Sequence, residues 1–532
     1  MPDGYSSIDI TQVQQLKPFK IDYSHVNDLT YVDKSNAPPQ SFAAYCAAGQ
    51  TGPLLVEQQT RPQFPLDLAD LQTYSAAQFP RGKMLVLVNY SIYPAIKLSV
   101  DQYVLDVAYE GYYATAYRVQ NGSPAQLRSF ILGQGPIAGV LMVGSLPTAW
   151  YEFDQCDDFS GSNSEFPCDL YYMDAYGVWS DPDNDGRFSG PVLHPMTALW
   201  VGRLWTPTGG GNDTVLLNDY FARNHKFRRG LLGCSNRALA FVDEDWIPFG
   251  NCALDYMFAP PNIDTITDPW KTDGDRYKAE LHQRRAWVHV CAHSSPYGHS
   301  FKYPGGPEWV PSTYLSDVNP PNAYFYNLFA CSNTRFTQPG YMGGWYIFDK
   351  SGGSVCNGLA AVGSTKAGSM LLFENFYGPM GAGKTIGEAF VAWWRAFGSQ
   401  HTLTTRRWHY GMTLLGDPTL DWRSGMVPVL RDPVDGDTFD HVPRLTRFSW
   451  DPIWLGGPPN EPVSYEIQIE EQGTGVGWSG QWAQGGSVYD VGASCMREYT
   501  FTAAGRGRWR VRAKVVGRPC PWSEWNYLRY TA

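Results

Sequence analysis

Charged residues are scarce in this sequence. Asp, Glu, Lys and Arg make up only 17% of its 532 residues, the net charge is −10, and no block is rich in Lys or Arg. Because non-specific binding to nucleic acids needs concentrated positive charge, a nucleic-acid partner is not expected. Disorder is also excluded, since aromatic residues reach 15% and predict a rigid globular protein with broad apolar interfaces.

Long hydrophobic runs are absent as well. No apolar stretch reaches about 18 residues, which excludes a membrane span. The start of the chain, MPDGYSSIDI, lacks a charged end followed by an apolar core, so it is not a signal peptide. We therefore expect either an intracellular protein or an exported one whose leader has been replaced by the starting Met.

The ten cysteines favour export. Three pairs lie in loop-rich or strand-edge contexts, where disulfides could close short loops. These pairs are Cys156 with Cys168, Cys234 with Cys252, and Cys495 with Cys520. Three further cysteines lie in or just after apolar strands, where a reduced thiol is more typical. They are Cys291, Cys331 and Cys356. On this balance we expect a secreted or cell-surface protein.

Three segments of the chain differ in their patterning. Residues 1–80 have weak periodicity and scattered Pro, as in an N-terminal extension or pro-segment. Residues 81–425 alternate buried strands with helices, which predicts an α/β domain with a mostly parallel sheet and helices on both faces. After a linker rich in Pro and Asp, residues 426–532 show strands of period two and predict an immunoglobulin-like β-sandwich.

In a parallel sheet, functional side chains gather at the carboxyl ends of the strands. Two predicted strands of residues 81–425 deliver a reactive side chain there. AWVHVCAH ends in His293, and AYFYNLFA is followed at once by Cys331. Cys331 could be a core thiol, half of a disulfide or a nucleophile. An imidazole nearby lowers the pKa of a thiol and makes it nucleophilic, which favours the third role.

The blocks around these residues, WVHVCAHSS and YNLFACSNTRF, resemble the His and Ala-Cys blocks of the gingipain family of clan CD cysteine peptidases, whose fold is caspase-like. The likeness covers roughly residues 81–425. It continues, in family order, through FPCDLYYMDAYGVWSDPDNDGRF, MTALWVGRL, GLAAVGSTKAGSM, KTIGEAF and GMTLLGDPTL. The resemblance implies an endopeptidase acting on proteins or peptides. In it Cys331 attacks the carbonyl, and His293 assists the thiolate or protonates the leaving amine.

One position departs from that family, which usually has Gly after its His. Here the residue is Ser294. A backbone N–H survives the change, so the N–H groups of Ser294 and Cys331 are the expected oxyanion donors. His299 is a rival base. The departure keeps open a catalytically degenerate binding or adhesion protein, and a transpeptidase would share the same acyl-enzyme.

The segment SDPDNDGRF predicts a structural Ca²⁺ site, which the family resemblance also implies. Carboxylates at alternate positions before a Gly repel one another unless a cation lies between them. The expected ligands are Asp181, Asp183 and Asp185, with Asp174 and the Arg187 carbonyl as lesser candidates. Position twelve is not acidic, so the loop is not a complete EF-hand, and a solvated acidic turn is the alternative.

Asp169, in CDLYYMD, matches the acidic position that gives arginine-specific members of the family their preference for a basic P1 side chain. A buried carboxylate needs a cationic partner, and a substrate Arg or Lys would supply one. The equal alternative is a structural hydrogen-bond acceptor beside the calcium loop.

Two further motifs have structural alternatives. GPMGAGKT, residues 378–385, satisfies the phosphate-loop pattern of a nucleotide hydrolase, but LLFENFYG before it is a poor strand. A Gly turn that caps a helix starting near Lys384 is therefore favoured. In the sandwich, FSWDP and WSEW resemble a fibronectin type III domain. There Trp522 and Trp525 could interleave with Arg508, Arg510 and Arg512 as a cation–π ladder, either as a structural staple or as a binding face.

Overall fold

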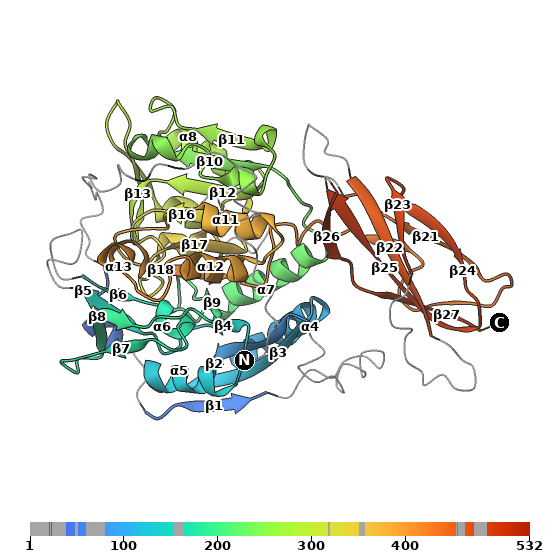
Figure 1. The fold of residues 1–532 in the computed structure, drawn as a ribbon, viewed down its shortest axis with the longest axis horizontal. Coiled ribbons are helices and arrows are strands. Elements are labelled where there is room, and N and C mark those ends of the chain that lie inside the picture. Colours follow the sequence, from blue (N-terminus) through green and yellow to red (C-terminus); the bar gives the residue numbers. More distant parts are fainter. Residues whose placement is uncertain are drawn as a thin grey trace.

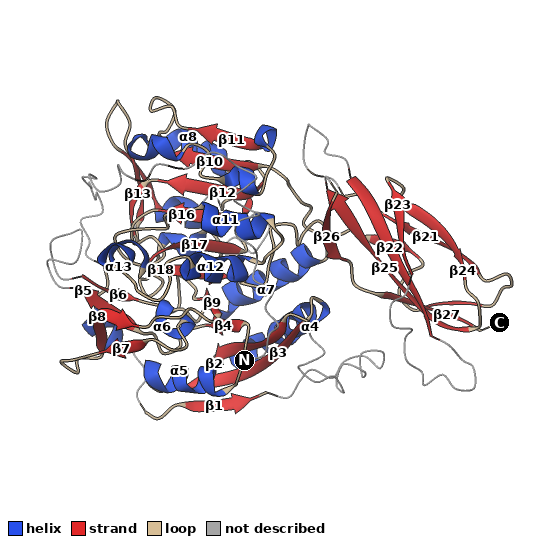
Figure 2. Ribbon diagram, viewed as in Figure 1, coloured by secondary structure: helices blue, strands red, loops and turns tan. Residues whose placement is uncertain are grey.

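The computed structural model describes residues 21, 23, 39–47, 52–59, 80–153, 164–317, 320–350, 357–453, 455, 463–472, 487–515 and 517–531. Within this range the chain forms a large α/β body and, beyond residue 430, an all-β body beside it (Figures 1 and 2). No helix among the described residues is long and apolar enough to cross a membrane. Cys156 and Cys356, together with most of residues 1–80, lie outside the described residues.

One eleven-stranded sheet forms the centre of the α/β body. In spatial order its strands are β1 (Leu55–Gln58), β3 (Tyr112–Gln120), β2 (Gly82–Asn89), β4 (Gly139–Val143), β9 (Trp200–Leu204), β18 (Met412–Gly416), β17 (Ala360–Ser364), β16 (Ala323–Phe329), β12 (Arg285–Cys291), β10 (Ala238–Val242) and β11 (Ile263–Ile266). The inner strands are buried on both faces, as their continuous apolar sequences predict.

The sheet consists of two parallel blocks of opposite direction. Strands β3, β2, β4, β9 and β18 run parallel to one another, and so do β17, β16, β12, β10 and β11. The blocks meet where β17 pairs antiparallel with β18, and β1 adds an antiparallel edge to β3. The strands that deliver His293 and Cys331 are neighbours in the second block. Their carboxyl ends therefore meet at one edge of the sheet, as predicted.

Helices flank this sheet. The α-helices are α2 (Phe42–Ala47), α4 (Tyr93–Tyr109), α5 (Pro124–Gly133), α6 (Leu170–Met173), α7 (Thr214–Arg228), α8 (Gly274–Leu281), α9 (Ser312–Asp317), α10 (Met342–Trp345), α11 (Glu374–Gly381), α12 (Ile386–Arg395) and α13 (Leu403–His409). Short 3₁₀ segments are η4 (Glu244–Phe249), η5 (Leu254–Tyr256) and η6 (Pro260–Asn262).

The phosphate-loop pattern begins inside a helix. Its first four residues are the end of α11, where a phosphate loop needs a strand before it, and its last residue, Thr385, caps α12 in a reciprocal pair with Glu388. The turn is thus a helix cap, and the structure gives no support to a nucleotide site.

Two small sheets extend beyond the strand ends. One contains β13 (His293–Ser295), β14 (Gly298–Phe301) and β15 (Glu308–Pro311). The other contains β6 (Ser164–Pro167), β5 (Trp150–Phe153), β8 (Arg187–Leu193) and β7 (Val178–Ser180). The predicted calcium loop connects β7 to β8. Both small sheets lie on the side of the body away from the sandwich (Figure 1).

The C-terminal body is the predicted two-sheet β-sandwich. One sheet has β19 (Leu430–Asp432), β21 (Leu445–Trp450) and β24 (Met496–Thr500). The other has β20 (Asp437–Phe439), β27 (Asn526–Tyr530), β25 (Gly505–Val515), β22 (Val463–Gln472) and β23 (Ser487–Gly492), with β26 (Arg518–Trp522) paired to β25.

The predicted cation–π ladder is confirmed on β25. Arg510 lies between the two indole rings, 4.8 Å from the ring centroid of Trp522 and 4.3 Å from that of Trp525. Arg508 lies 4.3 Å from the Trp525 ring and Arg512 lies 4.5 Å from the Trp522 ring. Arg510, Arg512, Trp522 and Trp525 of this ladder face the α/β body across a cavity.

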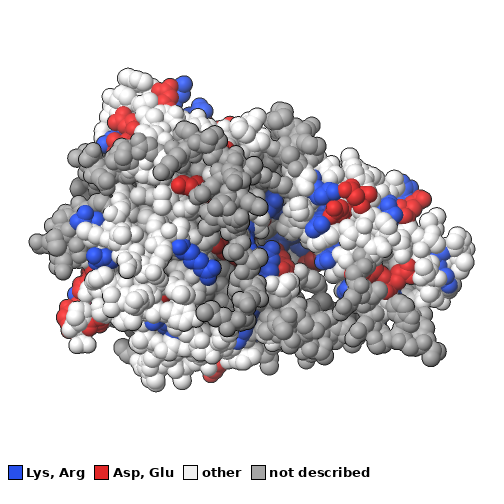
Figure 3. All heavy atoms as spheres, viewed as in Figure 1, with Lys and Arg blue, Asp and Glu red and all other residues white. Residues whose placement is uncertain are grey.

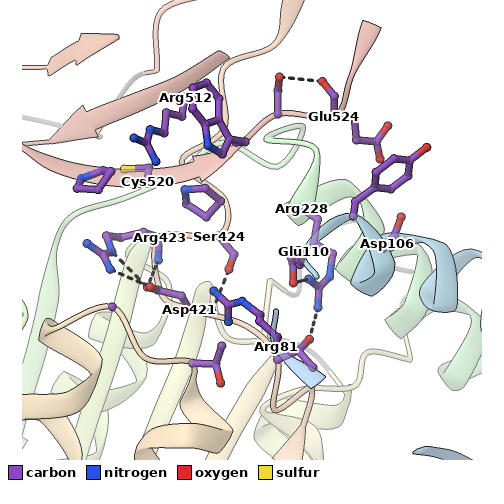
Figure 4. A pocket seen from close by; sticks show the side chains of 18 of the residues that line it. Arg81, Asp106, Glu110, Arg228, Asp421, Arg423, Ser424, Arg512, Cys520 and Glu524 are labelled. Carbon is purple, nitrogen blue, oxygen red and sulfur yellow. Dashed lines mark hydrogen bonds and ion pairs between the residues drawn. The ribbon is translucent and has the colours of Figure 1, made fainter. Parts of the chain in front are cut away.

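A cavity of about 730 Å³ separates the two bodies and is lined from both sides (Figure 4). Several of its charged side chains are held in ion pairs. Arg228 binds Glu110 and, at 2.5 Å, Asp417, while Arg423 binds Asp421 at 2.8 Å. Charges of both signs are also intermingled on the face drawn in Figure 3, where neither forms a continuous patch.

The disulfide predictions that fall on described residues are wrong. Cys495 and Cys520 are separate thiols. Cys520 is buried with its sulfur 4.0 Å from that of Met426. Cys252 lies against Cys291 and forms no bridge to Cys234. These cysteines are close in sequence, but tertiary packing places Cys252 and Cys520 against other residues.

Candidate active site

The loops that carry His293 and Cys331 lie side by side. Strands β12 and β16 pair in parallel register, and beyond them the Ala292 amide donates to the Phe329 carbonyl at 3.1 Å. Further out, the Ser294 hydroxyl donates to the Cys331 carbonyl at 2.9 Å. Ser294, three residues after the end of β12, therefore touches Cys331, two residues after the end of β16.

Cys331 is partly exposed, unlike Cys168, Cys252 and Cys291, which are buried. Ser332 directly after it has a φ of 55°, in the left-handed region. The chain thus turns sharply once the thiol is placed. A partly exposed thiol on such a turn does not have the environment of a core cysteine, and this rules out the first reading of Cys331.

Two neighbours hold the His293 imidazole in place, and Lys302 in turn binds one of them. The imidazole Nε2 lies 2.6 Å from Oδ2 of Asp245. The Lys302 ammonium forms an ion pair with the same oxygen at 2.5 Å. The Trp246 ring lies against the imidazole, with ring centroids 4.6 Å apart. Only 5% of the His293 side chain is exposed, so its orientation is fixed by packing as well as by hydrogen bonding.

Asp245 is a site residue that the sequence analysis missed. Partial burial acts to raise the pKa of its carboxyl, but hydrogen bonds from His293 and Lys302 outweigh this and lower it. The carboxylate therefore stays ionised beside the imidazole. The available signal was the acidic run Asp243–Asp245 at the carboxyl end of β10, the strand next to β12.

A surface depression of about 230 Å³ opens beside His293. It is lined by Glu244, His293, Ser300, Lys302, Tyr303 and Pro307. Polar groups from η4 and β14 thus border the imidazole on its open side, where a peptide could approach.

His299, the rival base, is a core residue. It is fully buried, and its Nε2 lies 2.9 Å from the Tyr346 hydroxyl. Burial lowers its pKa to about 3, so the ring stays neutral. Ser294 lies opposite His299 in the β13–β14 pair. The hydrogen bond from its hydroxyl to the Cys331 carbonyl places Ser294 next to Cys331, while its role as an oxyanion donor stays a prediction.

Asp169 lies in a different environment from the one predicted. It is buried before α6, and the guanidinium of the fully buried Arg203 binds both of its carboxylate oxygens, with Nε at 3.0 Å. Thr413 donates a third hydrogen bond at 2.8 Å. The cationic partner is internal to the chain, so the structure favours the structural role and corrects the assignment of Asp169 to substrate binding.

The predicted calcium loop is ordered largely by its own hydrogen bonds. Asp181 accepts the amides of Asp185 and Gly186 at 3.2 and 3.0 Å. Asp185 accepts the Arg187 amide at 2.9 Å and pairs with the Arg187 guanidinium. Asp181 is thus turned into the loop and Asp185 towards Arg187, while Asp183 is exposed.

A third carboxylate joins them from a neighbouring strand. Oxygens of Glu152 on β5, Asp183 and Asp185 lie within 4.8 Å of one another. Sequence reasoning missed Glu152 because it lies outside the loop. Asp174, a lesser candidate, is instead buried and accepts four hydrogen bonds. Their donors are the amides of Tyr176, Gly177 and Met196 and the Trp179 indole. This network corrects its assignment as a ligand.

The comparisons with known proteins identify the fold. No protein-family model matches the sequence, and no curated protein matches it. The solved structure of the Arg-specific cysteine proteinase gingipain R (RGPB) is similar, with a TM-score of 0.50 and 12% identity over 85% of this chain and 98% of that one. The complex of Porphyromonas gingivalis RgpB pro- and mature domains gives a TM-score of 0.49 and 12% identity over 84% of this chain and 100% of that one.

The α/β body therefore has the caspase-like fold of a gingipain cysteine proteinase, as the sequence predicted. The sandwich is similar to the fibronectin type III domain of a human fibronectin type III domain containing protein, at 19% identity over 19% of this chain and 80% of that one. The TM-score of this match is 0.13. The type III assignment stays a prediction, while the two-sheet architecture follows from the strand pairing.

Proposed function

We propose that this chain is a cysteine endopeptidase in which Cys331 is the nucleophile and His293 the acid–base partner. The observation that carries the proposal is the hydrogen bond from Ser294 to the Cys331 carbonyl, which joins the two strand-end loops. It links the residue after His293 to Cys331, whose thiol is partly exposed, while the His293 imidazole is held by a carboxylate. The fold of a cysteine proteinase supports the same chemistry.

In the proposed reaction the Cys331 thiol gives its proton to His293, and its sulfur attacks the carbonyl carbon of the scissile bond. A C–S bond forms and the π electrons move onto oxygen, where the backbone N–H groups of Ser294 and Cys331 donate to the oxyanion. When the intermediate collapses, the C–N bond breaks and the amine leaves with a proton from His293. Water then attacks the thioester, which releases the acid and restores the thiol.

Asp245 acts through His293 and is a positioning residue. Its carboxylate fixes the ring orientation and stabilises the imidazolium that forms during proton transfer. Lys302 holds the other side of the same carboxylate oxygen and keeps it ionised. The chain therefore uses a Cys–His–Asp arrangement whose third member follows β10.

The proposal assigns structural Ca²⁺ to Glu152, Asp183 and Asp185. Three hard oxygen donors within 4.8 Å of one another fit this cation. The Arg187 guanidinium binds Asp185 and lies 3.1 Å from Glu152, so it neutralises part of the charge of the cluster. The ion would join the β7–β8 connection to β5 and has no part in the chemical steps.

Stoichiometric labelling tests the nucleophile. A thiol-reactive peptidyl ketone should label the full-length protein once, at Cys331 by mass-spectrometric mapping, and Cys331→Ala should prevent it. Parallel ketones with Arg, Lys and uncharged P1 groups test the basic P1 preference, which can no longer rest on Asp169. An unlabelled, folded protein would identify a non-catalytic binding protein. Product transfer to an added amine would identify a transpeptidase.

A further inference from the structure

Two thiols and an imidazole meet beneath the segment that carries Asp245. Cys252 lies between η4 and η5, while His289 and Cys291 lie two residues apart on one face of β12. Their ligating atoms all lie within 4.8 Å of one another, and the two sulfurs are 3.9 Å apart. All three side chains are fully buried.

The imidazole of this cluster has one nitrogen engaged and one unpartnered. The Nδ1 atom of His289 lies 2.7 Å from the Tyr377 hydroxyl, which also accepts a hydrogen bond from the Trp287 indole at 3.1 Å. The Nε2 atom is buried without a hydrogen-bond partner. Such an atom costs free energy in a protein interior. A metal-ligating His has this same arrangement, with one nitrogen oriented by a hydrogen bond and the other left for the metal.

We infer that Cys252, His289 and Cys291 bind one soft, thiophilic cation, Zn²⁺ or Cu⁺. Thiolate sulfur and imidazole nitrogen are the donors that both ions prefer. Zn–S bonds of about 2.3 Å at a tetrahedral angle place two sulfurs about 3.8 Å apart. The observed separation of 3.9 Å matches this value. A disulfide instead requires about 2.05 Å.

Binding replaces the two thiol protons, which are released to solvent. The cluster contains no fourth His, Cys, Asp or Glu from the described part of the chain. The fourth position on Zn²⁺ would then be taken by one small non-protein ligand, whereas Cu⁺ can be held by three protein ligands. The two ions share the donor chemistry, and the experiment separates them.

The position of the cluster gives the ion a structural role. Cys252 belongs to the segment that follows Asp245 and Trp246, and Cys291 precedes His293 by two residues. A cation shared between them would tie this segment to β12. It would thereby keep the carboxylate and the indole against the catalytic imidazole without touching the substrate.

The test uses the full-length Cys331→Ala protein in excess Ca²⁺. This background removes the catalytic thiol and saturates the oxygen cluster. After reduction and treatment with a chelator selective for transition metals, the protein is titrated with Co²⁺ as the spectroscopic substitute for Zn²⁺, and separately with Cu⁺. We expect one ion bound per chain, a thiolate-to-cobalt charge-transfer absorption in the first arm, and a higher Tm with the preferred ion.

Matched variants locate the binding. Cys252→Ser and Cys291→Ser should each remove most of the absorption. Cys168→Ser should not, because that buried thiol lies elsewhere and donates to the Tyr410 carbonyl at 3.2 Å, a bond that a hydroxyl can keep. Elemental analysis of the unsubstituted protein, purified without chelator, tests the inference even if the cluster variants do not fold. An ion-free protein that gives no thiolate–cobalt absorption would overturn it, as would recovery of Cys252 and Cys291 as a disulfide.

Discussion

Two aspartates, each bound to a basic side chain, mark two regions of the α/β body that differ in purpose. Asp169, before α6, is 2% exposed and accepts hydrogen bonds from Arg203, which is itself fully buried. Asp245, in η4, is 18% exposed and holds an imidazole beside a surface depression. Arg203 is permanently charged, so its pair can only hold the fold together. An imidazole can gain and lose a proton, so its pair can also take part in chemistry. The type of basic partner therefore indicates whether each aspartate has a structural or a chemical role, and it does so better than the burial of the aspartate.

The largest expected effect is the loss of peptide cleavage when the Cys331 thiol, next to the Asp245 region, is removed. Cys331→Ala should abolish peptide cleavage for every substrate, because no acyl-enzyme can form. Hydrolysis of a fluorogenic peptide mixture is the measurement, with Cys168→Ser as the matched control that keeps its activity. Turnover that survives in Cys331→Ala would move the chemistry away from this edge of the sheet.

The second largest effect is expected when Asp245 is neutralised, and it should be an effect on catalysis and not on stability. Asp245→Asn is expected to lower kcat by about 100-fold or more, with little change in KM, because the imidazole loses its orientation and the charge that stabilises its protonated form. Steady-state kinetics across a range of pH is the measurement. Asp275→Asn, an exposed residue paired with Lys278, is the control. If KM rose while kcat held, Asp245 would contact the substrate instead of positioning His293.

Asp169→Asn should give the opposite pattern. Removing one partner of a buried ion pair costs about 3–5 kcal/mol of unfolding free energy, because the other charge stays buried. Chemical denaturation measures this loss, and replacing Arg203 with Met in the same protein should recover part of it. The ratio of kcat/KM between Arg and uncharged P1 substrates should not change. A selective loss of the Arg substrate in a stable protein would restore the substrate-binding role.

Calcium removal tests the region after β7. Binding to the folded state alone stabilises it by about 2.7 kcal/mol when the ion is at 100 times its Kd. Chelation should therefore lower Tm, and Asp183→Asn should reduce that shift, since this exposed carboxylate belongs to the cluster. An unchanged Tm after strong chelation, with no calcium in the purified protein, would make the loop a solvated acidic turn.

The smallest expected effect is a pH dependence of stability caused by Asp243, which lies in the same segment as Asp245. Burial raises the pKa of Asp243 to about 8, although backbone amides of Lys302 and Glu244 act against the shift. Between the unfolded and folded pKa values the folded state holds the extra proton, so stability falls as pH rises. From about pH 6 to about pH 7 the loss should be about 1.4 kcal/mol. Asp243→Asn should flatten this slope, and an equal slope in the variant would contradict the shift.

Local signals predicted the parts of the site that lie on strands. Continuous apolar runs end at His293 and Cys331, and parallel strands bring their carboxyl ends together. The partners could not be read in this way, because tertiary packing selects them. Asp245 lies 48 positions before His293, and Arg203 lies 34 positions after Asp169. No local periodicity connects such pairs. The sequence therefore left substrate binding and a structural role equally open for Asp169, because it gave no sign of the arginine that occupies the carboxylate.

The short strand β1 has a consequence for how this protein should be handled. It covers the outer edge of β3 along four residue pairs, from Leu55 with Gln120 to Gln58 with Tyr117. Without it, β3 would present a row of unpaired amides and carbonyls, the surface on which sheets of separate molecules join and aggregate. Expression variants trimmed at residue 80 should therefore be more prone to aggregate than ones that begin before Leu55. Any protease that processes the N-terminal segment would have to leave this strand in place to keep the product in solution.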